Sequence, residues 1–259
     1  MDSPRIVPIQ SIKEEAHEIK TITFLDTTPI HPGQFYMIWI PEVDEIPMSV
    51  STITPHEKGI TFRRVGTATA SLFQLKKGDK IGIRGPYGNG FRLTGKTGLF
   101  VAGGTGIAMM APAIEKALQQ KIKLDAIIGV KTKNELFFYD RLKHLDIDIH
   151  IATDDGTDGI QGTAVHLAEK LLNTTKYDAI YTCGPEKMMK ALFGLNTSPV
   201  FQASLERYMK CGIGLCGQCC VGHGQRVCVE GPVFQKDQLQ KINDFGVFTR
   251  DSSGKKIML

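Results

Sequence analysis

Five of the six cysteines lie within eighteen residues near the end of the chain: Cys211, Cys216, Cys219, Cys220 and Cys228. The spacing Cys-x4-Cys-x2-Cys with a later fourth cysteine is that of plant-type [2Fe–2S] proteins, in which four thiolates hold two irons and two sulfides. Glycines 212, 214 and 217 allow positive φ and let backbone N–H groups face the sulfurs. We therefore expect Cys211, Cys216, Cys219 and Cys228 to ligate a [2Fe–2S] cluster.

Two alternatives stay open for this segment. The first alternative is zinc, which favours closely spaced cysteine pairs. The spacing from Cys211 to Cys216 fits such a pair only loosely, and the spacing from Cys219 to Cys228 is too long for a second pair. Disulfides are not expected, since clustered cysteines indicate metal binding in a reducing compartment. Cys220 cannot share one cluster with its neighbour Cys219, and we expect it to be a small buried residue.

Two glycine-containing loops follow apolar strands in the middle of the chain and predict a nucleotide site. Gly103, Gly104, Thr105 and Gly106 link a strand at 99–102 to a helix that runs to about residue 120. Cys183, Gly184 and Pro185 repeat this arrangement after a later strand. Amides at a helix N-terminus bind phosphate, and ligands of parallel sheets lie beyond the carboxyl ends of the strands. Both loops are also compatible with plain tight turns.

The nucleotide half favours NAD, although Lys131 and Lys133 could reach a 2′-phosphate. Cys183 lies either near the nicotinamide or simply at a buried strand end. No acid–base residue is nominated, because cofactors carry the chemistry of such proteins.

A flavin is expected because a nicotinamide transfers two electrons together whereas an iron–sulfur cluster transfers one at a time. The candidate segments are a strand start with Pro47, Met48, Ser49 and Val50, and a turn with Gly66 and Thr67 before a short helix at 68–75. The amides of that helix N-terminus could hold a diphosphate. Purely local strand-end and capping roles are the alternative.

The elements that position these residues fall into three predicted parts. Residues 1–95 show short β-rich runs at 17–25, 34–40, 46–53, 59–65 and 79–84, whose spacing suggests a barrel or a sandwich. We expect this part to be a barrel that binds the flavin. Residues 96–200 alternate strands with helices, including a helix at 135–142, and predict an α/β nucleotide-binding domain with a parallel sheet. Residues 201–259 form a small cluster-binding segment with a polar tail.

Composition excludes several functions. The chain of 259 residues has a net charge of +4, too small and too scattered for a nucleic-acid binder. No apolar run approaches the ~20 residues of a membrane span, and no signal peptide is expected. The chain is expected in the cytoplasm.

These motifs together resemble the ferredoxin–NADP reductase superfamily and, within it, the electron-transfer subunits of class 1B dihydroorotate dehydrogenase. The match covers nearly the whole chain, and it rests on the motifs above together with segments 85–91, 152–156, 204–216 and 228–234. The resemblance implies FAD on the barrel, NAD on the α/β half and [2Fe–2S] at the C-terminal end. It also implies an FMN-containing catalytic partner, in a heterotetramer with two copies of each subunit, in pyrimidine biosynthesis.

One position departs from the family pattern. Where the family carries a flavin-phosphate arginine before the Pro-x-Ser strand, this chain has Ile46, and Arg63 or Arg64 could substitute. We expect Arg64 to bind the flavin.

The same cofactors would also suit a sulfide dehydrogenase, a hydrogenase subunit or an NADPH–ferredoxin transhydrogenase. A non-enzymatic zinc-stabilised binding module is the remaining, more remote alternative.

Overall fold

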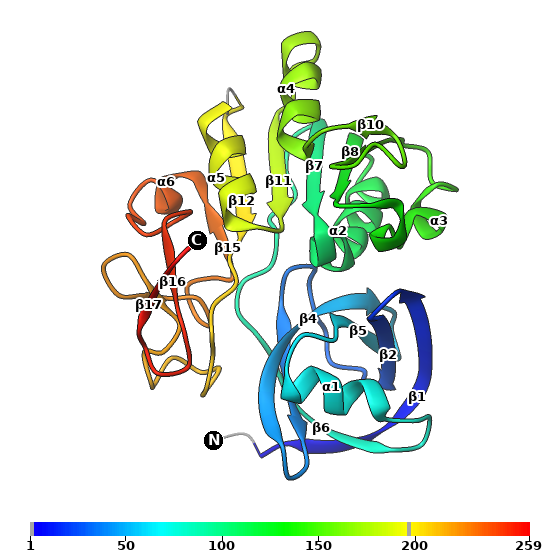
Figure 1. Ribbon diagram of the computed structural model, residues 1–259, viewed down its shortest axis with the longest axis vertical. Helices are drawn as coiled ribbons and strands as arrows, with labels where there is room; N and C mark the ends of the chain where they lie inside the picture. The colour runs from blue at the N-terminus through cyan, green and yellow to red at the C-terminus, as the bar shows by residue number, and fades with distance from the viewer. Residues whose placement is uncertain (1–2, 196–197) are drawn as a thin grey trace.

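The computed structural model describes residues 3–195 and 198–259. Its N-terminal part is a closed antiparallel barrel with strand order β1-β2-β5-β4-β3-β6. Its elements are β1 (Arg5–Ala16), β2 (Ile19–Leu25), β3 (Phe35–Ile40), β4 (Asp44–Ile53), β5 (Glu57–Arg63), helix α1 (Thr67–Gln74) and β6 (Lys80–Tyr87). Inward-facing aliphatic and aromatic side chains fill the barrel, and its ribbon lies below the α/β part in Figure 1. The predicted barrel is confirmed, whereas β1 was not predicted.

A buried carboxylate ties the barrel together. Asp26 accepts two hydrogen bonds from the Arg5 guanidinium, at 3.0 and 3.1 Å, and one from the Tyr36 hydroxyl at 2.7 Å. Burial alone would raise the pKa of Asp26, but the hydrogen bonds from Arg5, Tyr36 and Thr28 outweigh it and hold that pKa well below its ordinary value. A lowered carboxyl pKa stabilises the fold above about pH 4 and less so as pH falls further.

The Asp26→Asn variant should therefore lose about 2 kcal/mol of unfolding free energy at pH 7, because an amide cannot accept both guanidinium bonds. The difference in unfolding free energy between the variant and the wild type should stay constant from pH 8 to 5 and become smaller below about pH 4. Urea unfolding followed by fluorescence of Trp39, the single tryptophan, checks this. Asp44→Asn, at an exposed carboxylate, is the control and should change stability by less than about 0.5 kcal/mol.

The second part is built on a sheet of order β10-β9-β8-β7-β11-β12-β15, seven strands within the described ranges. Its strands are β7 (Thr97–Gly103), β8 (Lys123–Val130), β9 (Asp148–Thr153), β10 (Ile160–Gln161), β11 (Ala179–Cys183), β12 (Val200–Ser204) and β15 (Val233–Gln235). All neighbours pair in parallel except β12 and β15. The predicted parallel α/β sheet is confirmed.

Helices cover both faces of this sheet. Helix α2 (Ile107–Gln119) packs on one face, while α4 (Ala164–Thr174) and α5 (Glu186–Leu195) pack on the other. The helix predicted at 135–142 is only a 3₁₀ turn, η2 (Lys133–Glu135), followed by the short α3 (Tyr139–Leu142). A second 3₁₀ turn, η1 (Gly104–Gly106), leads directly into α2.

The C-terminal part is short of regular structure. It contains β13 (Cys220–Val221), β14 (Gln225–Arg226), α6 (Lys236–Leu239), β16 (Phe248–Arg250) and β17 (Lys256–Met258). The predicted boundary at residue 200 falls at the start of β12, and β12 and β15 extend the nucleotide-domain sheet. The cysteine segment is therefore anchored at both ends in that sheet.

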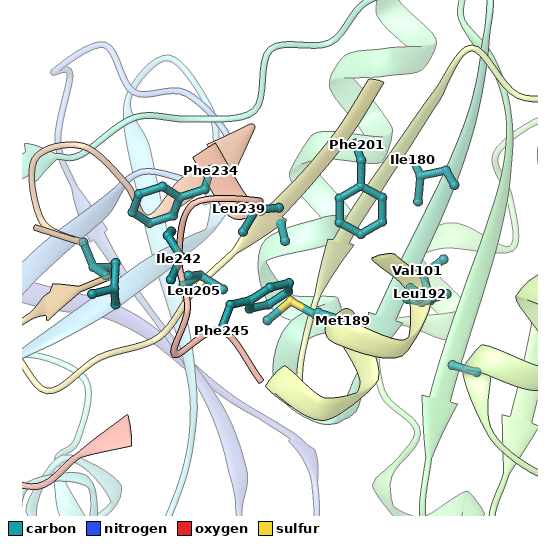
Figure 2. Packing of buried hydrophobic residues seen from close by; sticks show 14 of the residues in the cluster. Val101, Ile180, Met189, Leu192, Phe201, Leu205, Phe234, Leu239, Ile242 and Phe245 are labelled. Atoms are coloured by element: carbon teal, nitrogen blue, oxygen red, sulfur yellow. The ribbon is translucent and has the colours of Figure 1, made fainter. Parts of the chain in front are cut away.

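One hydrophobic cluster joins these parts. Figure 2 shows side chains of the sheet and α5, such as Val101 and Met189, continuing into C-terminal residues such as Phe234, Ile242 and Phe245. Phe35 of the barrel and the sulfurs of Cys219 and Cys228 belong to the same cluster. No helix among the described residues is long and apolar enough to cross a membrane.

Candidate functional site

The four predicted cluster cysteines lie in two contacting pairs. The backbone N–H of Cys216 approaches Sγ of Cys211 at 3.5 Å, and the two side chains also contact each other. Cys219 and Cys228 form the second pair, in which the Cys228 thiol donates to Cys219. The second pair is buried while Cys216 is exposed, so the cysteine site reaches the surface on one side.

Backbone amides surround Cys211 and favour its thiolate. Burial opposes ionisation, but N–H groups of Cys216, Ile213 and Leu215 outweigh it and lower the pKa of Cys211 to about 7. The bond from Cys228 lowers the pKa of Cys219, and the same contact raises the pKa of Cys228. The loop is thus arranged for sulfur in its negatively charged form, as metal ligation requires.

The pairing of the thiols is compatible with a diiron cluster. Among the residues that the structure describes, no group of three or more Cys, His, Asp or Glu side chains is already arranged around a single point. A [2Fe–2S] cluster instead takes two thiolates on each iron, and two contacting pairs are what the loop provides.

Cys220 points elsewhere: its Sγ faces the carbonyl oxygen of Gly224 at 3.9 Å, and it is half-buried rather than fully buried. Burial raises its pKa, with the neighbouring Cys219 adding to the shift.

A cavity of about 420 Å³ lies between the barrel and the nucleotide domain. Pro47, Met48 and Ser49 line its barrel side, and Thr105, Gly106 and Cys183 line its other side. Val50 instead points into the barrel core. Gly66 and Thr67 are exposed at the start of α1, between Val65 and Thr69, which do line the cavity. The N-cap residue Gly66 has no side chain to bond the first amides of α1, which leaves these amides available to a phosphate, while the Thr69 hydroxyl accepts from the N–H groups of Val65 and Gly66.

The two candidate arginines differ in position. Arg63 lines this cavity and its neighbour, and it pairs with Glu135 at 3.2 Å. Arg64 is exposed, lines neither cavity, and forms an ion pair with Glu18. Ile46 packs against the barrel core. The arginine that lines the cavity between the barrel and the nucleotide domain is therefore Arg63, which the sequence offered only as an alternative to Arg64.

The neighbouring cavity, of about 840 Å³, lies at the carboxyl ends of the sheet strands. It is lined by Gly103, Gly104 and Thr105 from the first predicted loop and by Gly184 and Pro185 from the second. The loops touch: a Cβ on Gly106 would lie 2.3 Å from the carbonyl oxygen of Cys183. Only glycine permits this approach, which brings two phosphate-binding backbones to one place.

Three further predicted residues can now be placed. Cys183 is buried at the wall of the smaller cavity, and desolvation raises the pKa of its thiol, so it stays neutral. Lys131 lines the larger cavity, whereas Lys133 lies 3.7 Å from Asp158.

The two cavities share a wall formed by Arg63, Thr105, Glu206 and Arg207. The side chain of Glu206 is exposed, and the protein atoms around it, together with the charge of Glu186, raise the pKa of its carboxyl. Arg207 forms a buried bidentate pair with Glu186, both bonds at 2.9 Å.

Glu206, Arg207 and Thr69 also line the cavities, although no motif predicts them individually. The segment 204–216, which carries part of the family resemblance, contains Glu206 and Arg207 and is the signal that indicates these two.

A barrel that borders one cavity, a second cavity at the carboxyl ends of a parallel sheet and a loop with four cysteines together fit an NAD-linked flavoprotein oxidoreductase with an iron–sulfur centre. The family models agree: residues 100–193 match the oxidoreductase NAD-binding domain, and residues 206–240 match the iron-sulfur cluster binding domain of dihydroorotate dehydrogenase B. The chain belongs to the family of electron transfer subunits of dihydroorotate dehydrogenase B.

Relatives of full length support this. The probable electron transfer subunit of dihydroorotate dehydrogenase B (NAD(+)) from Methanocaldococcus jannaschii is 44% identical over 261 residues, covering 99% of each chain. The corresponding protein of Thermoplasma volcanium is 44% identical over 253 residues, covering 97% of each chain.

Solved structures give the same fold. A chain of an NADH-dependent reduced ferredoxin-NADP oxidoreductase, studied for flavin-based electron bifurcation, aligns with a TM-score of 0.83 at 25% identity, covering 94% of this chain and 91% of that one. A ferredoxin NADP+ reductase from Neisseria gonorrhoeae with bound FAD and NADP aligns with a TM-score of 0.65 at 20% identity, covering 75% and 91%. The predicted cofactor set of FAD, [2Fe–2S] and NAD is confirmed.

Proposed function

We propose that this chain receives electrons from the FMN of a catalytic dihydroorotate dehydrogenase subunit and delivers them to NAD⁺. The route would run through a [2Fe–2S] cluster and then FAD, in a cytoplasmic heterotetramer of two subunits of each kind that serves pyrimidine biosynthesis. The 44% identity to the relatives above, which are named as electron transfer subunits, supports this partner over a hydrogenase or a sulfide dehydrogenase.

The continuity of the three candidate sites carries the proposal. The nucleotide and flavin cavities share a wall, and the flavin cavity is lined by Phe35 and Met209, which pack in one apolar cluster with Cys219 and Cys228. The flavin cavity therefore adjoins the nucleotide cavity on one side and, through this apolar cluster, the cysteine segment on the other.

The residues proposed for each cofactor follow from this placement. The cluster would be held by Cys211, Cys216, Cys219 and Cys228. The flavin would lie on Pro47, Met48 and Ser49, with its phosphates at Arg63, Gly66 and Thr67. NAD would lie on Gly103–Gly106 and Gly184–Pro185, with Cys183 at the wall towards the flavin. We retain three functional parts, 1–95, 96–200 and 201–259, with β12 and β15 as the anchors of the last.

The role of the chain itself is to bind the cofactors, to orient them and to keep water away from them. A bound flavin exchanges a hydride with nicotinamide and single electrons with an iron–sulfur cluster. The uncapped amides of α1 and the glycine loops bind phosphates through their N–H groups. Glu206 lies at the wall that the two cavities share.

The test combines composition and partner dependence. Anaerobically isolated protein should contain two irons and one FAD per chain, and NADH should bleach the flavin absorbance. The chain alone should not oxidise dihydroorotate, and adding the catalytic subunit should couple dihydroorotate oxidation to NAD⁺ reduction. A colourless zinc-containing protein, or a chain that reduces ferredoxin but forms no complex with that subunit, would contradict the proposal.

A further inference from the structure

A charged pair on the barrel contacts the cluster loop through its backbone. The Arg84 guanidinium, whose side chain is only 10% exposed, binds the Glu45 carboxylate at 2.6 and 2.7 Å. Its Nη2 also donates to the carbonyl oxygen of Cys211 at 3.2 Å. Arg84 thus lies between a barrel carboxylate and the first candidate cluster ligand.

The loop backbone also lies against the barrel next to this contact. A Cβ on Gly212 would lie 2.7 Å from Met37 of β3, so the loop backbone rests directly on the barrel wall. Tyr87, at the end of β6, lies beside the same glycine and close to Arg84, whose Nη1 is 3.5 Å from its hydroxyl. The loop therefore contacts the barrel at Met37, Tyr87 and Arg84.

A carbonyl held by a cation also orients its loop. In a trans peptide the C=O and the following N–H point in opposite directions. A second arginine shows the effect: Arg226 donates to the carbonyl oxygen of Gly214 at 3.0 Å, and the next amide, of Leu215, faces the Cys211 sulfur.

We propose that Arg84 is a positioning residue for the iron–sulfur cluster, which fixes the Cys211 turn on the flavin barrel and, with Glu45, sets the reduction potential of the cluster. The inference rests on the proposed cluster ligation. Reduction adds one negative charge to a cluster, so a nearby cation favours the reduced form and a nearby carboxylate disfavours it. The pair balances these effects, and Arg84 is the member in contact with the loop.

The direction in which the reduction potential of the cluster shifts distinguishes this role from a purely structural role of Arg84. Arg84→Met leaves Glu45 as an unbalanced negative charge and should lower the cluster potential. Glu45→Gln leaves Arg84 as an unbalanced cation and should raise it. Each should change the ratio of reduced to oxidised cluster at a fixed potential by at least about threefold, which is ~30 mV for a one-electron couple.

The measurement is a potentiometric titration of the cluster in the isolated subunit, followed by electron paramagnetic resonance. The double variant Arg84→Met/Glu45→Gln, with no net change in charge, and Arg84→Lys should both lie closer to wild type than Arg84→Met. The matched control is Arg141→Met, since Arg141 also binds a carboxylate twice, Glu115 at 2.7 and 2.8 Å, and a carbonyl, that of Ser51 at 2.8 Å, but lies in the other domain. It should leave the potential unchanged.

Equal potentials in all variants, or shifts of the same sign in Arg84→Met and Glu45→Gln, would overturn the inference. If the substitutions only loosened the loop, the direction of the shift in potential would not depend on the sign of the charge removed. If Arg84→Met loses its iron during isolation, Glu45→Gln and Arg84→Lys still test the sign. Wild-type protein without iron would instead overturn the proposed ligation itself, and this inference with it.

Discussion

The Cys216→Ser variant should lose its [2Fe–2S] cluster while it keeps FAD and the reduction of that flavin by NADH. Cys216 is the exposed member of the first thiol pair, so its replacement removes one ligand without opening the apolar cluster that contains Cys219 and Cys228. The flavin and nucleotide cavities contain none of the four proposed ligands in their walls. Electron delivery between the catalytic subunit and NAD⁺ should therefore stop at the cluster.

Iron content and visible spectra measure the loss of the cluster. Stopped-flow reduction by NADH measures whether the flavin is still bound and reduced. The control is Cys220→Ser, whose sulfur faces Gly224 and which should keep iron, flavin and coupled activity. Loss of NADH-driven flavin reduction in Cys216→Ser, with FAD still bound, would mean that the cofactors do not act in the proposed order. Retention of coupled activity without iron would remove the cluster from the route.

The barrel and the alternating sheet could be predicted because their signals are local. Short β-rich runs and strand–glycine–helix units have a fixed period, and the structure places them within a few residues of the predicted bounds. Strand β1 was not predicted because the consecutive charged residues Lys13, Glu14 and Glu15 interrupt the alternation of apolar and polar side chains. The helix expected at 135–142 failed because Phe138 takes a φ of 62°, which interrupts helical geometry.

The site was harder to predict where it depends on distant pairings. Cysteine spacing indicated a cluster, since its ligands are close in sequence. Which of two adjacent arginines faces the cavity depends on strand register and on the partners Glu18 and Glu135, which lie far apart in the chain. The contact of Arg84 with Cys211 spans 127 residues, and no local pattern predicts it.

Arg207 should be the residue between the two cavities whose loss costs most stability. Its guanidinium and the Glu186 carboxylate are 3% and 7% exposed, and each satisfies the other through two hydrogen bonds. Arg207→Met leaves a carboxylate buried without its partner, which should cost about 3–5 kcal/mol of unfolding free energy at pH 8. Urea unfolding of the intact holoprotein measures this.

The pH dependence of that loss identifies its cause. Desolvation already raises the pKa of Glu186 against the attraction of Arg207, and removing Arg207 should raise it further. A carboxyl whose pKa is raised in the folded state destabilises that state as pH rises, and it no longer does so once it is protonated. The difference in unfolding free energy between wild type and Arg207→Met should therefore become smaller from pH 8 to pH 5. The double variant Arg207→Met/Glu186→Leu should recover much of the loss at pH 8, because an apolar pair leaves no buried charge. If the gap is independent of pH and the double variant recovers nothing, Arg207 contributes through packing and not through its charge.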